Sequence, residues 1–189
     1  DNTILIFTSD NGPVLDDGYQ DGAVSQLNGH RPSGVFRGGK YSAFEAGTRV
    51  PFIISWPNGI QKNQESEALV CQLDLLSSFA HFFGVSSSAL DNLDSKNLWG
   101  AFIGEDKKGR ALLVTSSGTS AITKGHMKYI LPNQGPAIAK LTNIELGNLS
   151  EDQLYDLKKD PGEKNNIAKQ NPELVRELKA DLLKIKGRH

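Results

Sequence analysis

The stretch that decides the fold runs from Thr3 to Gly12 and reads TILIFTSDNG. Its continuous run of apolar, β-branched and aromatic residues predicts a strand that is buried on both faces of a sheet. Ligands of open α/β sheets bind where such strands end, so the side chains of Asp10 and Asn11 are expected to point into a site. A carboxylate beside a carboxamide oxygen suits a hard cation such as Ca²⁺ or Mg²⁺, whereas a plain Asp-Asn-Gly turn is the alternative.

A second block spans residues 37–57, reads RGGKYSAFEAGTRVPFIISWP and closes in another apolar strand. Two glycines precede Lys40, so the backbone and the lysine can approach a ligand closely, although a solvated surface lysine is the alternative. Three charged residues flank this lysine and could contact a substrate. Near a glycine-rich turn they more often tie the loop down through charge-assisted hydrogen bonds, which we favour as their role. These supporting residues are Arg37, Glu45 and Arg49.

A third motif lies near the end, at residues 154–166, and reads LYDLKKDPGEKNN. Together and in this order, the three motifs resemble the sulfatase family, and the resemblance extends over nearly the whole chain. It implies an α/β fold, the C-terminal part of an alkaline-phosphatase-like sheet, followed by a small α+β subdomain with an antiparallel sheet and a C-terminal helix. The expected domains are residues 1–104 and residues 105–189.

The same resemblance implies the chemistry. It implies an arylsulfatase-like, formylglycine-dependent enzyme that hydrolyses sulfate monoesters of a small molecule or a glycan with the help of Ca²⁺. Asp10 and Asn11 match the late metal ligands of the family. Lys40 matches the family lysine that binds a sulfate oxygen, so it is the expected catalytic and substrate-binding residue. His30 lies in the long loop before it and could contact substrate or donate a proton, or be an exposed loop imidazole.

The resemblance also implies that the sequence is a C-terminal fragment. Formylglycine forms from the Cys or Ser of a Cys/Ser-x-Pro/Ala-x-Arg motif near the N-terminus of family members, and an early Asp-Asp pair begins the metal shell. The sequence is expected to begin downstream of both, and its single cysteine, Cys71, lacks the required Pro and Arg. We therefore expect the missing N-terminal part of the polypeptide as a partner, no activity of the fragment alone, and possible self-association through the uncovered first strand.

Composition agrees with an ordinary globular enzyme. The 189 residues, of which 38% are hydrophobic, suffice for one domain or two small units. The formal net charge of -1 predicts no attraction to nucleic acid or to an anionic membrane surface. No apolar run approaches the ~20 residues of a membrane span. The family resemblance favours a periplasmic or secreted location.

Two other functions stay open at this point. A phosphoesterase or phosphonate hydrolase of the alkaline-phosphatase-like superfamily would use the same combination of metal and anion-binding groups. From a different class, the chain could be a non-catalytic module that binds an anion or a glycan. A Cys-x-Pro-x-Arg motif upstream of Asp1 would separate the sulfatase from both.

The remaining pattern predicts the elements around these motifs. Residues 13–39 are rich in Gly, Asp and Pro and predict a long irregular loop, which in a compact domain is usually functional. Asp74 can cap a short helix, and Asn171 with Pro172 can start the final one. Short strands are expected at residues 111–115, 120–123, 128–131 and 153–157.

Overall fold

The computed structural model describes residues 2–19, 21–61, 63–85, 88–91 and 93–187. These residues form two compact units that alternate along the chain. The first combines Asp1–Phe7 with Phe52–Leu113, and the second combines Thr8–Pro51 with Val114–His189. The linear division into residues 1–104 and 105–189 stays a prediction for the domains of the parent enzyme.

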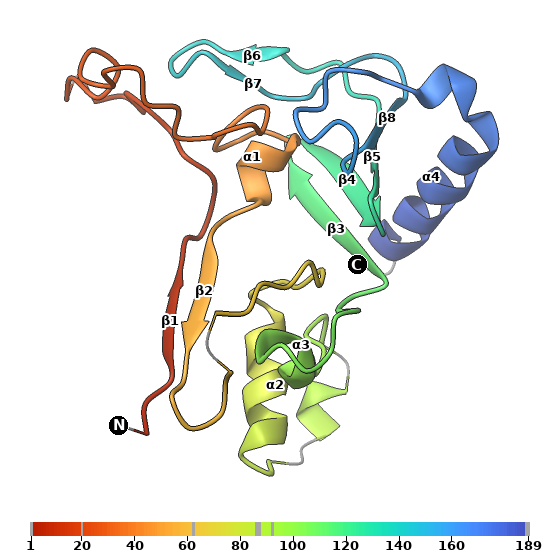
Figure 1. The fold of residues 1–189 in the computed structure, drawn as a ribbon. Coiled ribbons are helices and arrows are strands. Elements are labelled where there is room, and N and C mark those ends of the chain that lie inside the picture. The colour runs from red at the N-terminus through yellow and green to blue at the C-terminus, as the bar shows by residue number, and fades with distance from the viewer. Residues whose placement is uncertain (1, 20, 62, 86–87, 92, 188–189) are drawn as a thin grey trace. The chain divides into compact units, whose positions relative to one another are not determined.

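Both apolar stretches form strands, as predicted, and β1 (Leu5–Thr8) pairs with β2 (Phe52–Ser55). It also contains α2 (Asp74–Phe82), the short 3₁₀ helix η1 (Ser88–Leu90) and α3 (Trp99–Phe102) (Figure 1). Aromatic rings pack this unit together. The ring centroid of Trp99 lies 4.5 Å from that of Phe82 and 6.0 Å from that of Trp56.

Asp74 has a different role from the predicted one. The residue before it, Leu73, occupies the N-cap position, and Asp74 is the first residue of α2. Its fully buried carboxylate accepts two hydrogen bonds from the Arg110 guanidinium and one, at 2.9 Å, from the backbone N–H of Lys96. The carboxylate also accepts the backbone N–H of Cys71, just before the helix, at 3.1 Å. A bidentate guanidinium–carboxylate pair is stronger than such a bond, so the main role of Asp74 is to join three segments of this unit.

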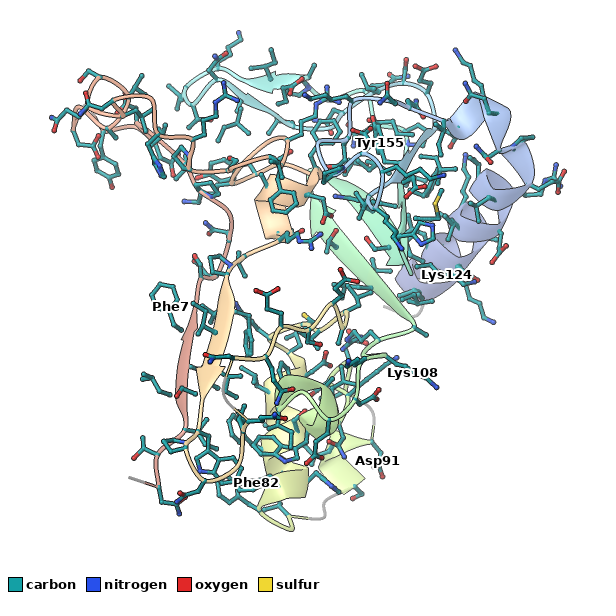
Figure 2. All side chains as sticks on the ribbon, in the orientation of Figure 1. Phe7, Phe82, Asp91, Lys108, Lys124 and Tyr155 are labelled. Carbon is teal, nitrogen blue, oxygen red and sulfur yellow. The ribbon has the colours of Figure 1, made fainter. Side chains whose placement is uncertain are left out.

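One face of the β1–β2 sheet is apolar and exposed. The side chains of Leu5, Phe7 and Ile53 are 67%, 62% and 61% exposed, and Figure 2 shows Phe7 pointing outward from β1. The prediction of a strand buried on both faces is therefore wrong for this chain. Its two strands alternate between exposed and partly covered residues, because no described segment covers the Phe7 side.

The second unit is built on an antiparallel sheet with the strand order β3-β4-β5-β8. These strands are β3 (Leu112–Ser117), β4 (Thr119–Lys124), β5 (Met127–Ile130) and β8 (Gln153–Asp156), all close to the predicted ranges. Both β4–β5 and β5–β8 pair antiparallel. The unit also contains α1 (Glu45–Thr48), β6 (Ile138–Ala139), β7 (Ile144–Glu145), η2 (Ala168–Gln170) and α4 (Pro172–Lys186).

Helix α4 covers this sheet, as the sequence predicts. It begins after the N-cap Asn171 with Pro172 in its first turn, and it packs on β4 and β5 (Figure 1). Every third or fourth residue is apolar, which places one stripe against the strands. The buried residues of that stripe are Val175, Leu178 and Leu182.

The segment that follows Lys40 packs on the same sheet. Phe44 and Tyr155 are buried in one apolar cluster with Ala121 and Ile130, and the two aromatic rings meet edge to face at 6.1 Å. Residues 13–39 contain neither helix nor strand in their described part, which confirms the predicted long loop. Among the described residues, no helix is both long enough and apolar enough to cross a membrane.

Candidate functional site

The predicted metal ligands follow directly after β1. Asp10 is exposed, and within the described part of the chain its carboxylate has no hydrogen bond or ion pair. Asn11 is half-buried and donates from Nδ2 to the carbonyl of Gly12 at 2.9 Å. This bond fixes the carboxamide and uses its nitrogen, so the oxygen Oδ1 is left to accept or to coordinate. The pair offers two oxygen ligands, the type that Ca²⁺ prefers.

Backbone contacts bring the Asp10–Asn11 turn beside the Lys40 segment. The N–H of Gly12 donates to the carbonyl of Gly47 at 3.0 Å, and the N–H of Lys40 donates to the carbonyl of Pro13 at 2.9 Å. A Cβ on Gly12 would lie 1.5 Å from the carbonyl oxygen of Ala46, so only glycine permits this approach. The predicted metal ligands and the predicted sulfate-binding lysine therefore lie on two adjoining stretches of backbone.

Lys40 is held by a carboxylate that the sequence did not single out. Its Nζ lies 2.9 Å from Asp17 Oδ2, and the hydroxyl of Tyr41 donates to the same oxygen at 2.9 Å. The hydrogen bond that the Lys40 ammonium donates to Asp17 raises the pKa of Lys40 and lowers the pKa of Asp17. Lys40 thus carries a positive charge that is already oriented toward an anionic oxygen. In the sequence, the one sign of this contact was the position of Asp17 in an acid-rich loop.

The glycines before Lys40 serve close packing within the chain. Gly38 has φ +85°, a conformation that strains other residues, and a Cβ on Gly39 would lie 2.7 Å from the carbonyl oxygen of Pro13. The close approach that the sequence suggested for a ligand is made here by the chain itself. Tyr41 follows with φ 76°, an unusual value for a residue other than glycine. Such conformations cluster at functional sites, where the surroundings hold them in place.

Arg37 contacts two other residues through hydrogen bonds and the aromatic ring of a third. Its guanidinium binds the carboxylate of Glu145 with two bonds, at 2.9 and 2.7 Å, and donates a third to the carbonyl of Glu163 at 2.8 Å. The guanidinium also lies over the ring of Phe44, 4.0 Å from its centroid. Hydrogen bonding raises the pKa of Arg37 and lowers that of Glu145, so both groups stay charged at neutral pH.

Glu45 and Arg49 belong to a second group of charges. Glu45 is buried, and its carboxylate lies 2.9 Å from Nζ of Lys128 and 3.2 Å from Nη1 of Arg49. The backbone N–H of Glu45 donates to Oε2 of Glu163 at 2.6 Å. All three residues expected to support the site therefore have protein partners, and their part in function stays a prediction.

His30 is not joined to these groups. It lies exposed in the long loop, and its described contact is a backbone bond from its N–H to the carbonyl of Leu27 at 2.8 Å. In the described part of the chain no three His, Cys, Asp or Glu residues gather closely enough to hold a metal ion. As calcium ligands, Asp10 and Asn11 would supply two of the six to eight oxygens that the ion prefers, and this role stays a prediction.

Comparison with known proteins shows the family of the chain. The family model named Sulfatase matches residues 1–85. The N-acetylgalactosamine-6-O-sulfatase of Bacteroides thetaiotaomicron is 51% identical over 190 residues, which cover 100% of this chain and 37% of that protein. The chain belongs to the sulfatase family. Human arylsulfatase A, a more distant sulfatase, is 30% identical over 95% of this chain and 37% of its own length.

Solved structures share the fold. A structure from work on the metabolism of multiple glycosaminoglycans by Bacteroides thetaiotaomicron matches with a TM-score of 0.94 and 51% identity, over 99% of this chain and 39% of that one. A structure of Ps i-CgsB in complex with k-i-k-neocarrahexaose matches with a TM-score of 0.70 and 26% identity, over 97% and 36%. The predicted α/β fold with an antiparallel sheet and a C-terminal helix is confirmed. The chain spans little more than a third of these relatives.

Proposed function

We propose that this chain is the part of a sulfate monoester hydrolase that supplies Lys40 to the sulfate group and Asp10 and Asn11 to a calcium ion. The observation that supports this best is the backbone pairing of the two segments, through the bond from Gly12 to Gly47. The similar N-acetylgalactosamine-6-O-sulfatase suggests the substrate, a 6-O-sulfated N-acetylgalactosamine within a glycan.

Lys40 can serve this reaction by its charge and its direction. As a sulfate ester bond breaks, negative charge spreads over the departing oxygen and the sulfuryl oxygens, and a preorganised cation stabilises it. In this structure, one carboxylate oxygen of Asp17 lies 2.9 Å from the ammonium nitrogen of Lys40. A sulfate oxygen would take the place of that carboxylate oxygen, so Asp17 holds the lysine ready for an anion before substrate arrives.

Asp10 and Asn11 can serve the same reaction by binding a calcium ion through their side-chain oxygens. A bound Ca²⁺ would supply positive charge against the sulfate oxygens, and these two side chains would hold it on one side. The remaining ligands and the formylglycine belong, in this proposal, to the N-terminal part of the parent polypeptide. The chain's single cysteine, Cys71, is half-buried and lacks the motif that formylglycine formation needs.

Residues 1–189 alone should therefore be inactive. The purified chain is expected to show no turnover of an aryl sulfate ester and no Ca²⁺ binding at micromolar concentration, because two oxygen ligands fall far short of a full shell. A colorimetric sulfatase assay and titration calorimetry measure the two, with the full parent enzyme as the positive control. Turnover above background, or micromolar Ca²⁺ affinity, would contradict the proposal that the formylglycine and the remaining calcium ligands belong to the N-terminal part of the parent polypeptide.

The exposed face of β1 and β2 should make the isolated chain self-associate. Leu5, Phe7 and Ile53 leave more than half of each side chain in water, and the parent chain is proposed to cover them. Light scattering should detect dimers or larger species, and Phe7→Lys should shift the chain toward monomer. Leu141→Lys, at an exposed position in the second unit, is the matched control and should leave association unchanged. A monomeric wild-type chain at high concentration would count against this.

A further inference from the structure

The motif at residues 154–166 has no part in the chemistry described so far, although it lies in one unit with Lys40. One of its residues, Glu163, is fully buried and has φ 50°, a left-handed conformation rare for glutamate. A buried carboxylate with such a backbone persists only where its surroundings determine it strongly. The contacts of Glu163 with other segments are therefore expected to matter for the fold around it.

Glu163 binds both ends of the segment that carries Lys40. Its carbonyl oxygen accepts a hydrogen bond from Nη1 of Arg37 at 2.8 Å, three residues before the lysine. Its Oε2 accepts the backbone N–H of Glu45 at 2.6 Å, five residues after the lysine. These contacts cross 126 and 118 residues of sequence, so the fold brings them together. The lysine stands in a loop whose two ends are fastened to one residue.

A buried ion pair strengthens the end of the loop at Glu45. Lys128, only 1% exposed, places Nζ 3.1 Å from Oε1 of Glu163 and 2.9 Å from Oε1 of Glu45. One ammonium thus bridges two carboxylates, one of which opens α1 while the other belongs to the tail motif. Burial raises the pKa of Glu163, and the charge of Lys128 opposes that change. Losing one member would leave uncompensated buried charge, which is strongly destabilising locally.

The end of the loop at Arg37 is held by contacts with Glu145. Arg37 binds the carboxylate of Glu145 with two bonds, and the hydroxyl of Ser42 donates to the carbonyl of Glu145 at 2.6 Å. The Lys40 loop is therefore held at Arg37, at Ser42 and at Glu45. The partners that hold these three residues lie more than 80 positions further along the chain.

We infer that Glu163 is a positioning residue for Lys40, so that the tail motif fixes the place of the sulfate-binding ammonium. The inference rests on the proposed function of Lys40. A shift of about 1 Å in a reacting or binding group can cost on the order of 10²-fold in rate, so an anchor far from the chemistry has a kinetic effect. Glu163 touches no substrate in this account and acts through the loop alone.

A double-mutant cycle in the full-length parent enzyme tests this. Glu163→Gln keeps an oxygen for the N–H of Glu45 but removes the charge that faces Lys128, and it should lower kcat/KM on a sulfated N-acetylgalactosamine by about 10- to 100-fold. In a Lys40→Ala background the same change should cost less than about threefold, since the lysine it positions is gone. Glu173→Gln, an exposed glutamate in α4, is the matched control and should cost nothing in either background.

The outcomes separate the inference from the proposed function. Equal losses in both backgrounds, in step with a lower unfolding temperature, would show a purely structural Glu163 and overturn the inference while Lys40 keeps its role. A Lys40→Ala enzyme with unchanged kinetics would overturn both. If Glu163→Gln fails to fold, Glu145→Gln takes its place in the cycle, because Glu145 is half-exposed and holds the other end of the loop. Additive losses for that variant would also reject the inference.

Discussion

Replacing Lys40 by alanine in the full-length parent enzyme is expected to lower turnover of a sulfate ester by roughly 10²- to 10³-fold, the usual cost of one preorganised electrostatic donor. Folding stability should change little, because Lys40 is partly exposed and its described ion pair, with Asp17, is also partly exposed. Lys40→Arg should recover little of the activity, since a planar guanidinium does not fit the position of a compact ammonium.

Steady-state kinetics on the sulfated sugar, together with thermal unfolding, measure both effects. Lys159→Ala is the matched control, because that side chain is 85% exposed and its described ion pair, with Asp156, lies at the surface. Wild-type kinetics for Lys40→Ala would make Lys40 an ordinary surface lysine. The proposed sulfate contact would then lose its main support in this chain.

Replacing Asp10 by alanine in the same enzyme is expected to abolish calcium-dependent activity. A carboxylate contributes more to a Ca²⁺ shell than a neutral oxygen does, and Asp10 has no described protein partner whose loss would explain the effect structurally. Excess Ca²⁺ should restore at most part of the activity. Asn11→Ala should cost less, because it removes a neutral ligand.

Activity as a function of added Ca²⁺ after chelation measures the change, with bound calcium counted by atomic absorption. Asp91→Ala, at an exposed position in the first unit, is the control and should titrate like the wild type. An Asp10→Ala enzyme with the wild-type calcium requirement and full metal content would remove Asp10 from the metal site.

Local signals in the sequence were enough for most elements. Alternation and turn residues located the strands of the second unit, and the stripe of Val175, Leu178 and Leu182 located α4 with its start after Asn171. The two-residue strands β6 and β7 were missed because so short a pairing leaves no periodic pattern. Asp74 was misread as a cap because its partner, Arg110, lies 36 residues away.

The site shows the same division. Asp10, Asn11 and Lys40 stand next to a recognisable strand end or next to glycines, so their motifs marked them as candidates. Asp17 has no such marker, and its contact with Lys40 depends on how a long irregular loop folds back. Glu163 belongs to a motif that was noticed, yet its contact with Glu45 spans 118 residues. Contacts of that range follow from the fold and not from spacing.

A crystal structure of the parent enzyme with Ca²⁺ and a 6-O-sulfated N-acetylgalactosamine would test the site most directly. We expect Nζ of Lys40 at about 2.7–3.2 Å from a sulfate oxygen, with its bond to Asp17 replaced. Oxygens of Asp10 and Asn11 should lie about 2.3–2.6 Å from the calcium ion. A sulfate bound away from Lys40, with the lysine still on Asp17 and the calcium held without Asp10, would contradict the proposed function.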